Sequence, residues 1–438
     1  MSIKETLLDR LKSRQATVGI VGLGYVGLPL AVEFAVEGFT VIGIDLSPSK
    51  VDAINRGESY IPDIPTSRLA PLVAAGKLRA STSYEALRAA DTVSICVPTP
   101  LRQTKDPDMS YVIDSVNAVA DVCHEGMLIV LESTTYPGTT DELVIPRLAQ
   151  AGFTPGENVF VAFSPERIDP ANPKYGVRNT PKVVGGVTPA CIEAVETLYS
   201  AAVDHVITVS SPATAEMVKL LENTFRAVNI GLVNEMALIC DKLGIDVWEV
   251  IRAASSKPFG FMPFYPGPGL GGHCIPIDPL YLSWKMKSLN YNARFIELAS
   301  EINTSMPHHV IDKVTTALND DCKSVRGSKV VILGVAYKRD VDDVRESPAL
   351  DVIGLLHKLG AKLEYHDPYV ARIRLEDEAI MESSSYSADL LASADAVVII
   401  TDHSTFDYQH LVDHSRLIID TRNATAKTAK SRARIVRI

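Results

Sequence analysis

Short apolar runs recur through the first half of the chain, and helical patterns separate them. Residues 3–14 have the spacing of an amphipathic helix, and the β-branched runs at 17–21 and 40–44 flank a helical run at 28–37. Further strand-like runs occur at 92–97, 127–131 and 159–163. Strands that alternate with helices build a parallel sheet with helices on its faces. The pattern therefore predicts a doubly wound, Rossmann-like domain.

The pattern changes after Pro212. Residues 213–243 carry apolar positions at helical spacing and contain no Pro and no Gly except Gly231. Two further helical runs follow at 245–254 and 293–318. We expect these segments to form a helical middle domain.

Strand-like runs return at Lys329. They cover 330–337, 363–365, 397–400 and 417–420, with a helical run after Pro348. The fold class expected is α/β, with two Rossmann-like doubly wound domains joined by a helical middle domain. The predicted domain boundaries are 1–211, 212–320 and 321–438.

Composition narrows the function classes. The net charge is −10 and no long basic run is present, which disfavours a nucleic-acid partner. No apolar run reaches membrane-spanning length, and the first residues do not resemble a signal peptide. The six cysteines show neither a CxxC pair nor zinc-ligand spacing, which is typical of a reducing compartment. We expect a cytoplasmic protein with no metal and no membrane partner.

The first predicted turn has the spacing of a dinucleotide-binding site. Gly22-Leu-Gly24-Tyr25-Val26-Gly27 joins a strand to a helix, and Asp45 ends the next strand 21 residues after Gly24. Such glycines allow a tight turn, close approach of a pyrophosphate and close packing of helix on strand, and the helix N-terminus attracts phosphate. Asp45 would bind the adenosine ribose and repel a 2′-phosphate, which favours NAD over NADP. Lys50, on the turn after Asp45, is either a solvated charge or a second contact to the ribose.

Polar residues follow the other strands of this sheet. Thr99, Thr134 and Glu166 lie at the carboxyl ends of strands, where ligands of parallel sheets bind. Thr134 could equally cap a turn, and Glu166 could equally be an exposed loop acid. Lys219 and Asn223 are four residues apart in the long helix and share a face, either as a solvated stripe or in a buried helix between lobes.

A glycine-rich and proline-rich loop precedes the third helical run. It reads Phe264-Tyr-Pro-Gly-Pro-Gly-Leu-Gly-Gly-His-Cys-Ile-Pro-Ile-Asp278 and presents Cys274. Its glycines, at 267, 269, 271 and 272, permit left-handed backbone angles and close approach to a ligand, while its prolines stiffen it. A thiol in such a cradle suits covalent catalysis, although a lone Cys more often packs as a small apolar side chain.

Together these motifs resemble the UDP-sugar 6-dehydrogenase family, which includes the UDP-glucose and GDP-mannose enzymes. The resemblance rests on the first glycine turn with Asp45, Ser133-Thr134, Ser164-Pro-Glu166, the Lys219 and Asn223 helix, the Cys274 loop, and residues 334–348. It covers nearly the whole chain. It implies an N-terminal NAD domain, a middle domain that dimerises or forms a higher homo-oligomer, and a C-terminal domain that binds the nucleotide of the sugar.

The resemblance also implies a chemistry. The C6 hydroxyl of a sugar is oxidised to a carboxylate with two NAD in succession, through a thiohemiacetal and a thioester on Cys274. Lys219, or a water held by Asp278, would act as base, and Lys219 and Asn223 would stabilise the oxyanion. Glu166, Thr134 and Asp278 would place the hydrolytic water.

By the same resemblance, two sets of contact residues are expected. The cofactor contacts are Gly22, Gly24, Tyr25, Val26, Gly27, Asp45, Lys50, Thr99, Thr134 and Arg345. The substrate contacts are Glu166, Arg167, Lys219, Asn223, Tyr265, Gly267, Gly269, Gly271 and Lys338.

Two departures from the glucose enzymes guide the choice of sugar. Ile277 stands where many of them carry Lys, and Glu166 is followed by Arg-Ile-Asp-Pro instead of Phe-Leu and a second Glu. The Cys274 loop resembles that of bacterial UDP-N-acetylglucosamine 6-dehydrogenases, which serve surface-polysaccharide synthesis. UDP-N-acetylmannosamine and UDP-glucose are the alternatives. Two other classes stay open: a two-electron hydroxyacid dehydrogenase without covalent catalysis, and a non-catalytic NAD sensor.

Overall fold

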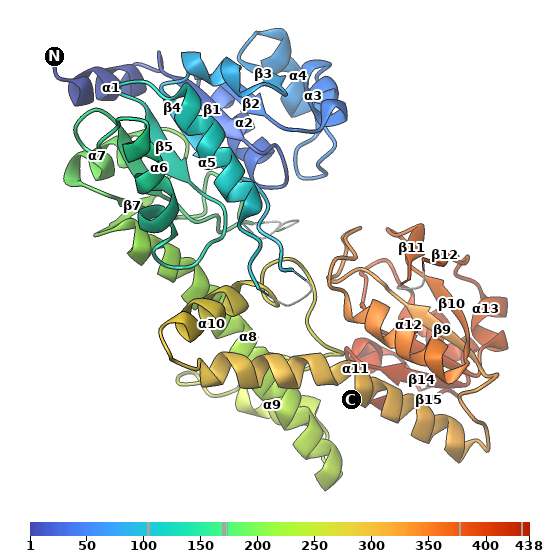
Figure 1. The fold of residues 1–438 in the computed structure, drawn as a ribbon. Helices are drawn as coiled ribbons and strands as arrows, with labels where there is room; N and C mark the ends of the chain where they lie inside the picture. Colours follow the sequence, from blue (N-terminus) through green and yellow to red (C-terminus); the bar gives the residue numbers. More distant parts are fainter. Residues whose placement is uncertain (103–105, 169–171, 173, 376–377, 431) are drawn as a thin grey trace. The chain divides into compact units, whose positions relative to one another are not determined.

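The computed structural model of the chain describes residues 1–102, 106–168, 172, 174–375, 378–430 and 432–438. Two compact units are present, one of residues 1–222 with 280–290 and one of residues 223–279 with 291–438 (Figure 1). The chain thus leaves the first unit at residue 222, returns for residues 280–290 and leaves it again. The domain boundaries at 211/212 and 320/321 remain a prediction.

The first unit is built on an eight-stranded sheet with the order β3-β2-β1-β4-β5-β6-β7-β8. All neighbouring strands are parallel except β6 and β7. The strand order reverses between β1 and β4, and a crevice at such a reversal is where doubly wound sheets bind ligands. The strands are β1 Thr17–Val21, β2 Thr40–Ile44, β3 Leu78–Ser81, β4 Thr92–Ile95, β5 Leu128–Leu131, β6 Phe160–Phe163, β7 Lys182–Gly186 and β8 Val206–Val209.

Helices pack on this sheet, α2 against β1 and β2 and α7 against β6 and β7. Helix α1 begins at a capping box in which Ser2 and Glu5 bond each other's backbone N–H groups. The helices are α1 Ile3–Lys12, α2 Gly27–Val36, α3 Pro48–Asn55, α4 Thr66–Ala74, α5 Ser110–Val122, α6 Ile145–Gln150 and α7 Pro189–Tyr199.

The first two predicted strands are confirmed to the residue, and β4, β5 and β6 agree within two residues. Strands β3, β7 and β8 were not predicted. β3 and β8 are short and only partly buried, and β7 contains a lysine and two glycines. None of the three shows the continuous apolar run that identifies a buried parallel strand.

The predicted helical segments are confirmed as α8 Pro212–Leu243, α9 Val247–Ala254 and α11 Arg294–Asp320. A fourth helix, α10 Asp278–Ser288, was not predicted and directly follows the Cys274 loop. Its Tyr281 is fully buried, and the hydroxyl donates to the Thr99 carbonyl at 2.8 Å. This contact attaches residues 280–290 to the first unit. Over the described residues, no helix is long and apolar enough to cross a membrane.

The second unit carries a five-stranded parallel sheet with the order β10-β9-β13-β14-β15 (Figure 1). Its strands are β9 Lys329–Leu333, β10 Lys362–His366, β13 Ala396–Ile399, β14 Leu417–Asp420 and β15 Arg434–Arg437. Helices α12 Pro348–Leu359, α13 Ala388–Ser393 and α14 Tyr408–His414 accompany it, and β11 Arg372–Arg374 pairs with β12 Ile380–Glu382. The predicted run at 330–337 is a strand only to Leu333, because Gly334 turns the chain out of the sheet with a φ of +78°. The α/β fold with two doubly wound sheets and a helical middle segment is confirmed.

Candidate functional site

The glycine turn after β1 has the geometry that a bound pyrophosphate needs. A Cβ at Gly22, whose φ is +88°, would lie 2.6 Å from the Cys96 carbonyl oxygen, and one at Gly27 would lie 1.8 Å from the Gly22 carbonyl oxygen. A Cβ at Gly24 would meet nothing within 4 Å in the described chain. Gly22 and Gly27 therefore serve the turn and the packing of α2, while Gly24 leaves room for a ligand. Helix α2 begins at Val26 without a side-chain cap, beside the exposed Tyr25.

Asp45 follows β2 and is held against this turn. Its carboxylate accepts hydrogen bonds from the Leu23 N–H at 3.0 Å and the Ser47 N–H at 2.9 Å. Lys50 lies in α3 and not on a turn, and its Nζ is 3.3 Å from the Asp45 carboxylate. The expectation that Lys50 lies on a turn is therefore wrong, and its side chain, 41% exposed, is both solvated and paired with Asp45. Lys50 is positioned to offset part of the negative charge that Asp45 presents.

A buried ionic network lies beyond the ends of β5 and β6. Lys182, on β7, approaches Glu132 at 2.6 Å and Glu166 at 3.3 Å, and the Tyr199 hydroxyl donates to Glu132. Burial raises the pKa of Glu132. Burial also pushes the pKa of Glu166 upward, but the charge of Lys182 and hydrogen bonds from the Ile168 and Arg167 N–H groups outweigh it and leave the pKa below its usual range.

Glu166 is therefore a buried, ionised carboxylate, and the alternative of an exposed loop acid is wrong. Its carbonyl oxygen accepts a hydrogen bond from Lys219 Nζ at 2.7 Å. Arg167, expected to contact substrate, forms an ion pair with Glu222 at 2.5 Å and donates to the Pro181 carbonyl at 2.6 Å. Thr134 and Thr99 are half-buried at the ends of their strands. Asp169 and Pro170, of the segment compared with the glucose enzymes, lie outside the described residues.

The second unit contains Cys274 and its neighbours. Asn223 Nδ2 donates to the buried Asp278 carboxylate at 2.5 Å. The Ile277 and Asp278 N–H groups donate to the Cys274 carbonyl at 3.1 and 2.8 Å, so Cys274 opens the turn that leads into α10. The half-buried Cys274 Sγ lies 2.9 Å from Nδ1 of His273. Because its sulfur has a polar partner, the thiol does not pack as an inert apolar side chain.

The glycines of this loop approach other parts of the second unit. Gly269 and Gly272 have positive φ, of +134° and +84°, as expected, but Gly267 and Gly271 do not. A Cβ at Gly267 would lie 2.5 Å from the Arg422 guanidinium, and one at Gly271 would lie 2.7 Å from Tyr337 Cβ. Gly269 and Gly272 thus use the left-handed angles that glycine permits, while Gly267 and Gly271 provide space for close approach.

Backbone hydrogen bonds fasten both ends of the loop. The Gly267 N–H donates to Asn234 at 2.9 Å, and the Gly272 N–H donates to the Arg345 carbonyl at 3.0 Å. The Gly267 N–H is thus already engaged within the protein. Tyr265, expected at the substrate, is exposed and stacks on Trp248 with ring centroids 6.2 Å apart.

Cationic side chains gather where β9 and β14 end. Lys338 is half-buried after β9, Arg339 pairs with Asp402, and Arg345 pairs with Asp343 at 2.6 Å. Arg422 follows β14 and donates to the Ile400 carbonyl at 2.9 Å. Burial lowers the pKa of Arg422 to about 10, with a further contribution from Arg339. The Asp420 carboxylate accepts from the Arg422 backbone N–H at 3.1 Å, whereas the described partner of the guanidinium is the Ile400 carbonyl. Sequence reasoning missed Arg422, for which position at a strand end was the only signal.

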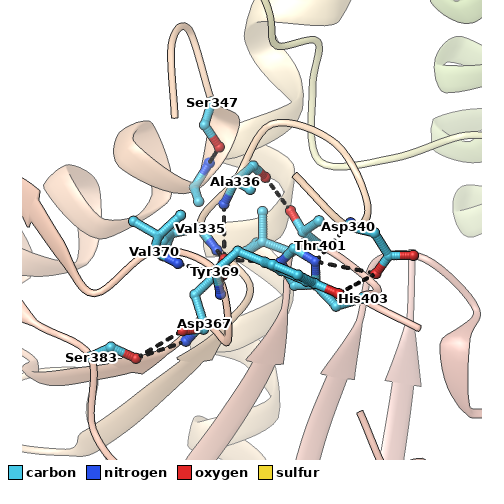
Figure 2. Close-up of polar contacts among 12 residues, drawn as sticks. Val335, Ala336, Asp340, Ser347, Asp367, Tyr369, Val370, Ser383, Thr401 and His403 are labelled. Carbon is cyan, nitrogen blue, oxygen red and sulfur yellow. Dashed lines mark hydrogen bonds and ion pairs between the residues drawn. The ribbon is translucent and has the colours of Figure 1, made fainter. Parts of the chain in front are cut away.

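Asp367 is the counterpart of Asp45 in the second sheet (Figure 2). The Gly334 N–H donates to the His366 carbonyl at 2.9 Å as Gly22 does to Ile44 at 2.7 Å. Asp367 also differs from Asp45, because its carboxylate accepts five hydrogen bonds and is buried. The donors are the Val335, Ala336, Tyr369 and Val370 N–H groups and Nε2 of His403.

Such a carboxylate has no free position for a ribose. The Asp340 N–H donates to Nδ1 of His403 at 2.9 Å, which assigns the ring proton to Nε2. The C-terminal domain also lacks a GxGxxG motif. Both this and the occupied carboxylate of Asp367 argue against dinucleotide binding at the second sheet. Across the described residues, no cluster of three or more His, Cys, Asp or Glu side chains could hold a metal ion.

Comparison with known proteins places the chain. The UDP-glucose/GDP-mannose dehydrogenase family matches it in three successive parts, by its NAD binding domain at 16–203, its central domain at 213–305 and its UDP binding domain at 331–427. The chain is 37% identical over 420 residues to the NDP-N-acetyl-D-galactosaminuronic acid dehydrogenase of Ralstonia nicotianae, covering 93% of this chain and 95% of that protein.

Two further relatives extend the likeness. The UDP-N-acetyl-D-mannosamine dehydrogenase of Salmonella typhi is 36% identical, covering 93% of this chain and 98% of its own length. The solved structure of the UDP-N-acetyl-D-mannosamine dehydrogenase of Pyrococcus horikoshii superposes with a TM-score of 0.88 at 32% identity, covering 96% of this chain and 99% of that one.

Proposed function

The chain belongs to the UDP-glucose/GDP-mannose dehydrogenase family and is an NAD-dependent nucleotide-sugar dehydrogenase, and we propose that it oxidises the C6 hydroxyl of a UDP-N-acetylhexosamine to the carboxylate. The observation that supports covalent catalysis most is the arrangement around Cys274. Its sulfur has an imidazole partner at 2.9 Å, and Asp278 and Asn223 are hydrogen-bonded to each other at the start of α10 and within α8. A hydroxyacid dehydrogenase without a covalent step would need no thiol at this position.

The first unit fits NAD. The open space at Gly24 and the carboxylate of Asp45 at the end of β2 are the features that a pyrophosphate and a ribose require. Bound NAD supplies the chemistry of accepting a hydride, and two NADH per sugar are the expected yield.

The residues of the chain supply proton transfer and charge stabilisation. In the first oxidation the hydroxyl proton passes to Lys219 or to a water held by Asp278, and an aldehyde results. The Cys274 sulfur then bonds to C6, and the amide of Asn223 with the ammonium of Lys219 stabilises the oxygen anion. The second oxidation turns this thiohemiacetal into a thioester. Water placed by Glu166, Thr134 and Asp278 breaks the C–S bond, releasing the carboxylate and the thiolate.

The nucleotide contacts are proposed for the second unit. Lys338 and Arg422 are cations at the ends of β9 and β14, where a parallel sheet binds ligands. Burial removes hydration from the Arg422 guanidinium, and its described partner is the neutral Ile400 carbonyl, so a diphosphate would be a favourable partner for it. Arg345 is proposed as a cofactor contact, in addition to its ion pair with Asp343.

For the sugar, two candidates stand first. The activities for which the Salmonella typhi and Pyrococcus horikoshii relatives are named favour UDP-N-acetylmannosamine. The Cys274 loop with Ile277 favours UDP-N-acetylglucosamine, and UDP-glucose ranks below both. A site that hydrogen-bonds an acetamide disfavours a sugar lacking it, because the buried polar groups of the site are left unpaired.

The experiment measures NADH released per sugar across a panel of UDP-hexoses. Two NADH per sugar and a uronic acid product are expected from wild type, with kcat/KM highest on an N-acetylated sugar. Cys274→Ala should release at most one NADH per sugar while it binds NAD as wild type does. A Cys274→Ala enzyme that still releases two NADH would disprove covalent catalysis, and a higher kcat/KM on UDP-glucose would exclude the N-acetylhexosamine assignment.

A homodimer is part of the proposal. Phe225, Leu232, Met236, Ile239 and Leu243 lie at helical spacing along α8 and are 37% to 66% exposed. Phe295 and Leu298 of α11 are exposed as well. Single exposed apolar residues are ordinary, but a stripe of this length indicates an interface. A second copy is the proposed occupant, since a two-fold pair buries the same stripe from both sides.

A further inference from the structure

His273 is the nearest titratable group to the reactive sulfur among the contacts described. Its Nδ1 lies 2.9 Å from Cys274 Sγ, within reach for transfer of one proton between sulfur and nitrogen. Adjacent residues do not ordinarily face each other, because side chains of neighbours diverge along an extended or helical chain. Here the chain bends at Gly272, with a φ of +84°, and turns into α10 at Cys274, which brings the two side chains to the same side.

A carboxylate is held beside this pair. The Gly272 N–H donates to the Arg345 carbonyl at 3.0 Å, and Asp343 accepts from the Arg345 N–H at 2.9 Å, so residues 343–345 are fastened to the Cys274 loop. Gly271 lets Tyr337 pack against the same loop. Burial raises the pKa of Asp343, but the hydrogen bonds and charge of Arg345, followed by the charge of His273, outweigh it and leave the pKa lowered. Because Gly272 directly precedes His273, its hydrogen bond to Arg345 places the segment of Asp343 next to His273, and the charge of His273 contributes to the lowered pKa of Asp343.

Resting on the proposed function, we propose that His273 is the catalytic base that deprotonates Cys274, with Asp343 as the positioning residue that stabilises the imidazolium. In the step, the Sγ–H bond breaks and an Nδ1–H bond forms. Sγ then bonds to the aldehyde carbon, and the proton passes from Nδ1 to the C6 oxygen, which leaves the imidazole neutral. The electron pair of the new C–S bond comes from the thiolate, so no oxidant enters this step.

The same pair serves the last step. When the thioester is hydrolysed, the neutral imidazole accepts the proton that the attacking water loses, and the resulting imidazolium stabilises the negative charge on the departing sulfur. The charged and titratable groups on the segments around the pair include Tyr337, Asp343, Arg345 and, at the start of α10, Asp278. Of these, Arg345 is the other cation able to favour a thiolate, although it is paired with Asp343 at 2.6 Å.

The test follows alkylation of Cys274 by iodoacetamide in the full-length protein between pH 5.5 and 9.5, with peptide mass spectrometry to identify the thiol. In wild type the rate should reach half its maximum below about pH 7.5, since an imidazolium neighbour lowers the pKa of a thiol into that range. His273→Gln should move the midpoint to about pH 8.5, the value of a free thiol, and slow alkylation at pH 7 about tenfold. Asp343→Asn should give a midpoint between those of wild type and His273→Gln.

Cys322 is the internal control, because it is an exposed thiol on the turn after α11 and its alkylation should be the same in every variant. Turnover of His273→Gln should recover as the pH is raised, which a merely structural role would not produce. An unchanged midpoint in His273→Gln would overturn the proposal. So would a midpoint that moves only in Arg345→Met, since Arg345 would then hold the thiolate.

Failure of the proposed function and failure of the role proposed for His273 give different experimental results. Two NADH per sugar from Cys274→Ala would overturn the proposed function whatever the alkylation profile. A Cys274 that is required for turnover, with a midpoint that His273→Gln leaves unmoved, would overturn the role of His273 alone.

Discussion

Lys182 is a buried cation that two carboxylates share. Glu132 and Glu166 lie 2.6 and 3.3 Å from its Nζ, and none of the three groups is accessible enough for water to replace a lost partner. Burial by itself lowers the pKa of Lys182, yet Glu132 and Glu166 hold it above the usual value. The lysine thus keeps Glu166 ionised and oriented.

Lys182→Met should destabilise the protein by about 3 to 5 kcal/mol, because it leaves buried carboxylates without their cation. It should also lower kcat more than it raises KM for the sugar, since Glu166 is proposed to place the hydrolytic water. Urea unfolding and steady-state kinetics measure the two effects. Lys4→Met, which removes the exposed pair of Lys4 with Glu193, is the matched control and should change neither. Unfolding of Lys182→Met at the wild-type urea midpoint would contradict the role of this network.

Sequence reasoning found residues that belong to motifs and missed those that act through packing. Asp45, Cys274 and Asp278 stand at fixed distances from glycines, and these spacings identify them. Lys182 could not be found, because β7 begins with that lysine and ends in two glycines, so that its strand was not predicted. Arg422 is separated from the Cys274 loop by about 150 residues of sequence, and only the fold brings its guanidinium to Gly267.

At the scale of elements, α8 was the most predictable part and α10 the least. Thirty-two residues of helical period, with no Pro after Pro212 and no Gly except Gly231, define α8. Helix α10 begins with Asp278-Pro, is only eleven residues long and follows a segment full of turn residues. It exists because Tyr281 is buried and donates to the Thr99 carbonyl, which is a tertiary contact that no local pattern reports.

The apolar side of α8 gives an element-scale prediction. Leu232→Glu places a charge in the proposed interface, and the cost of burying an unpaired charge should shift the protein to monomer at micromolar concentration. Sedimentation velocity across a concentration series measures the shift. Leu359→Glu, at the exposed end of α12, introduces the same charge outside the stripe and should leave the assembly unchanged. A Leu232→Glu protein that sediments like wild type would show that this side of α8 is not the interface.

For the whole molecule, the presence of two doubly wound sheets, with helical segments between them in the sequence, followed from the order of apolar patterns alone. The path of the chain did not, because residues 280–290 belong with residues 1–222 although they follow the Cys274 loop. Cys274 is therefore followed within a few residues by chain that belongs to the first unit, where Tyr281 donates to the Thr99 carbonyl. No periodicity in the sequence could show that residues 280–290 return to the first unit, because the return depends on the tertiary contact of Tyr281 with Thr99.

The difference between Asp45 and Asp367 has a consequence for inhibitors. An adenosine compound can place its ribose against Asp45, whereas every acceptor position of Asp367 is already taken by backbone N–H groups and His403. ADP-ribose should therefore compete with NAD and raise its apparent KM, and it should never be competitive against the sugar nucleotide. Initial-rate plots with each substrate varied in turn test this, and competition of ADP-ribose with the sugar nucleotide would contradict it. Inhibitor design against such an enzyme thus has two separate chemical starting points, an adenosine series and a uridine series. A compound optimised in the adenosine series will not lose selectivity by binding at the sugar-nucleotide site.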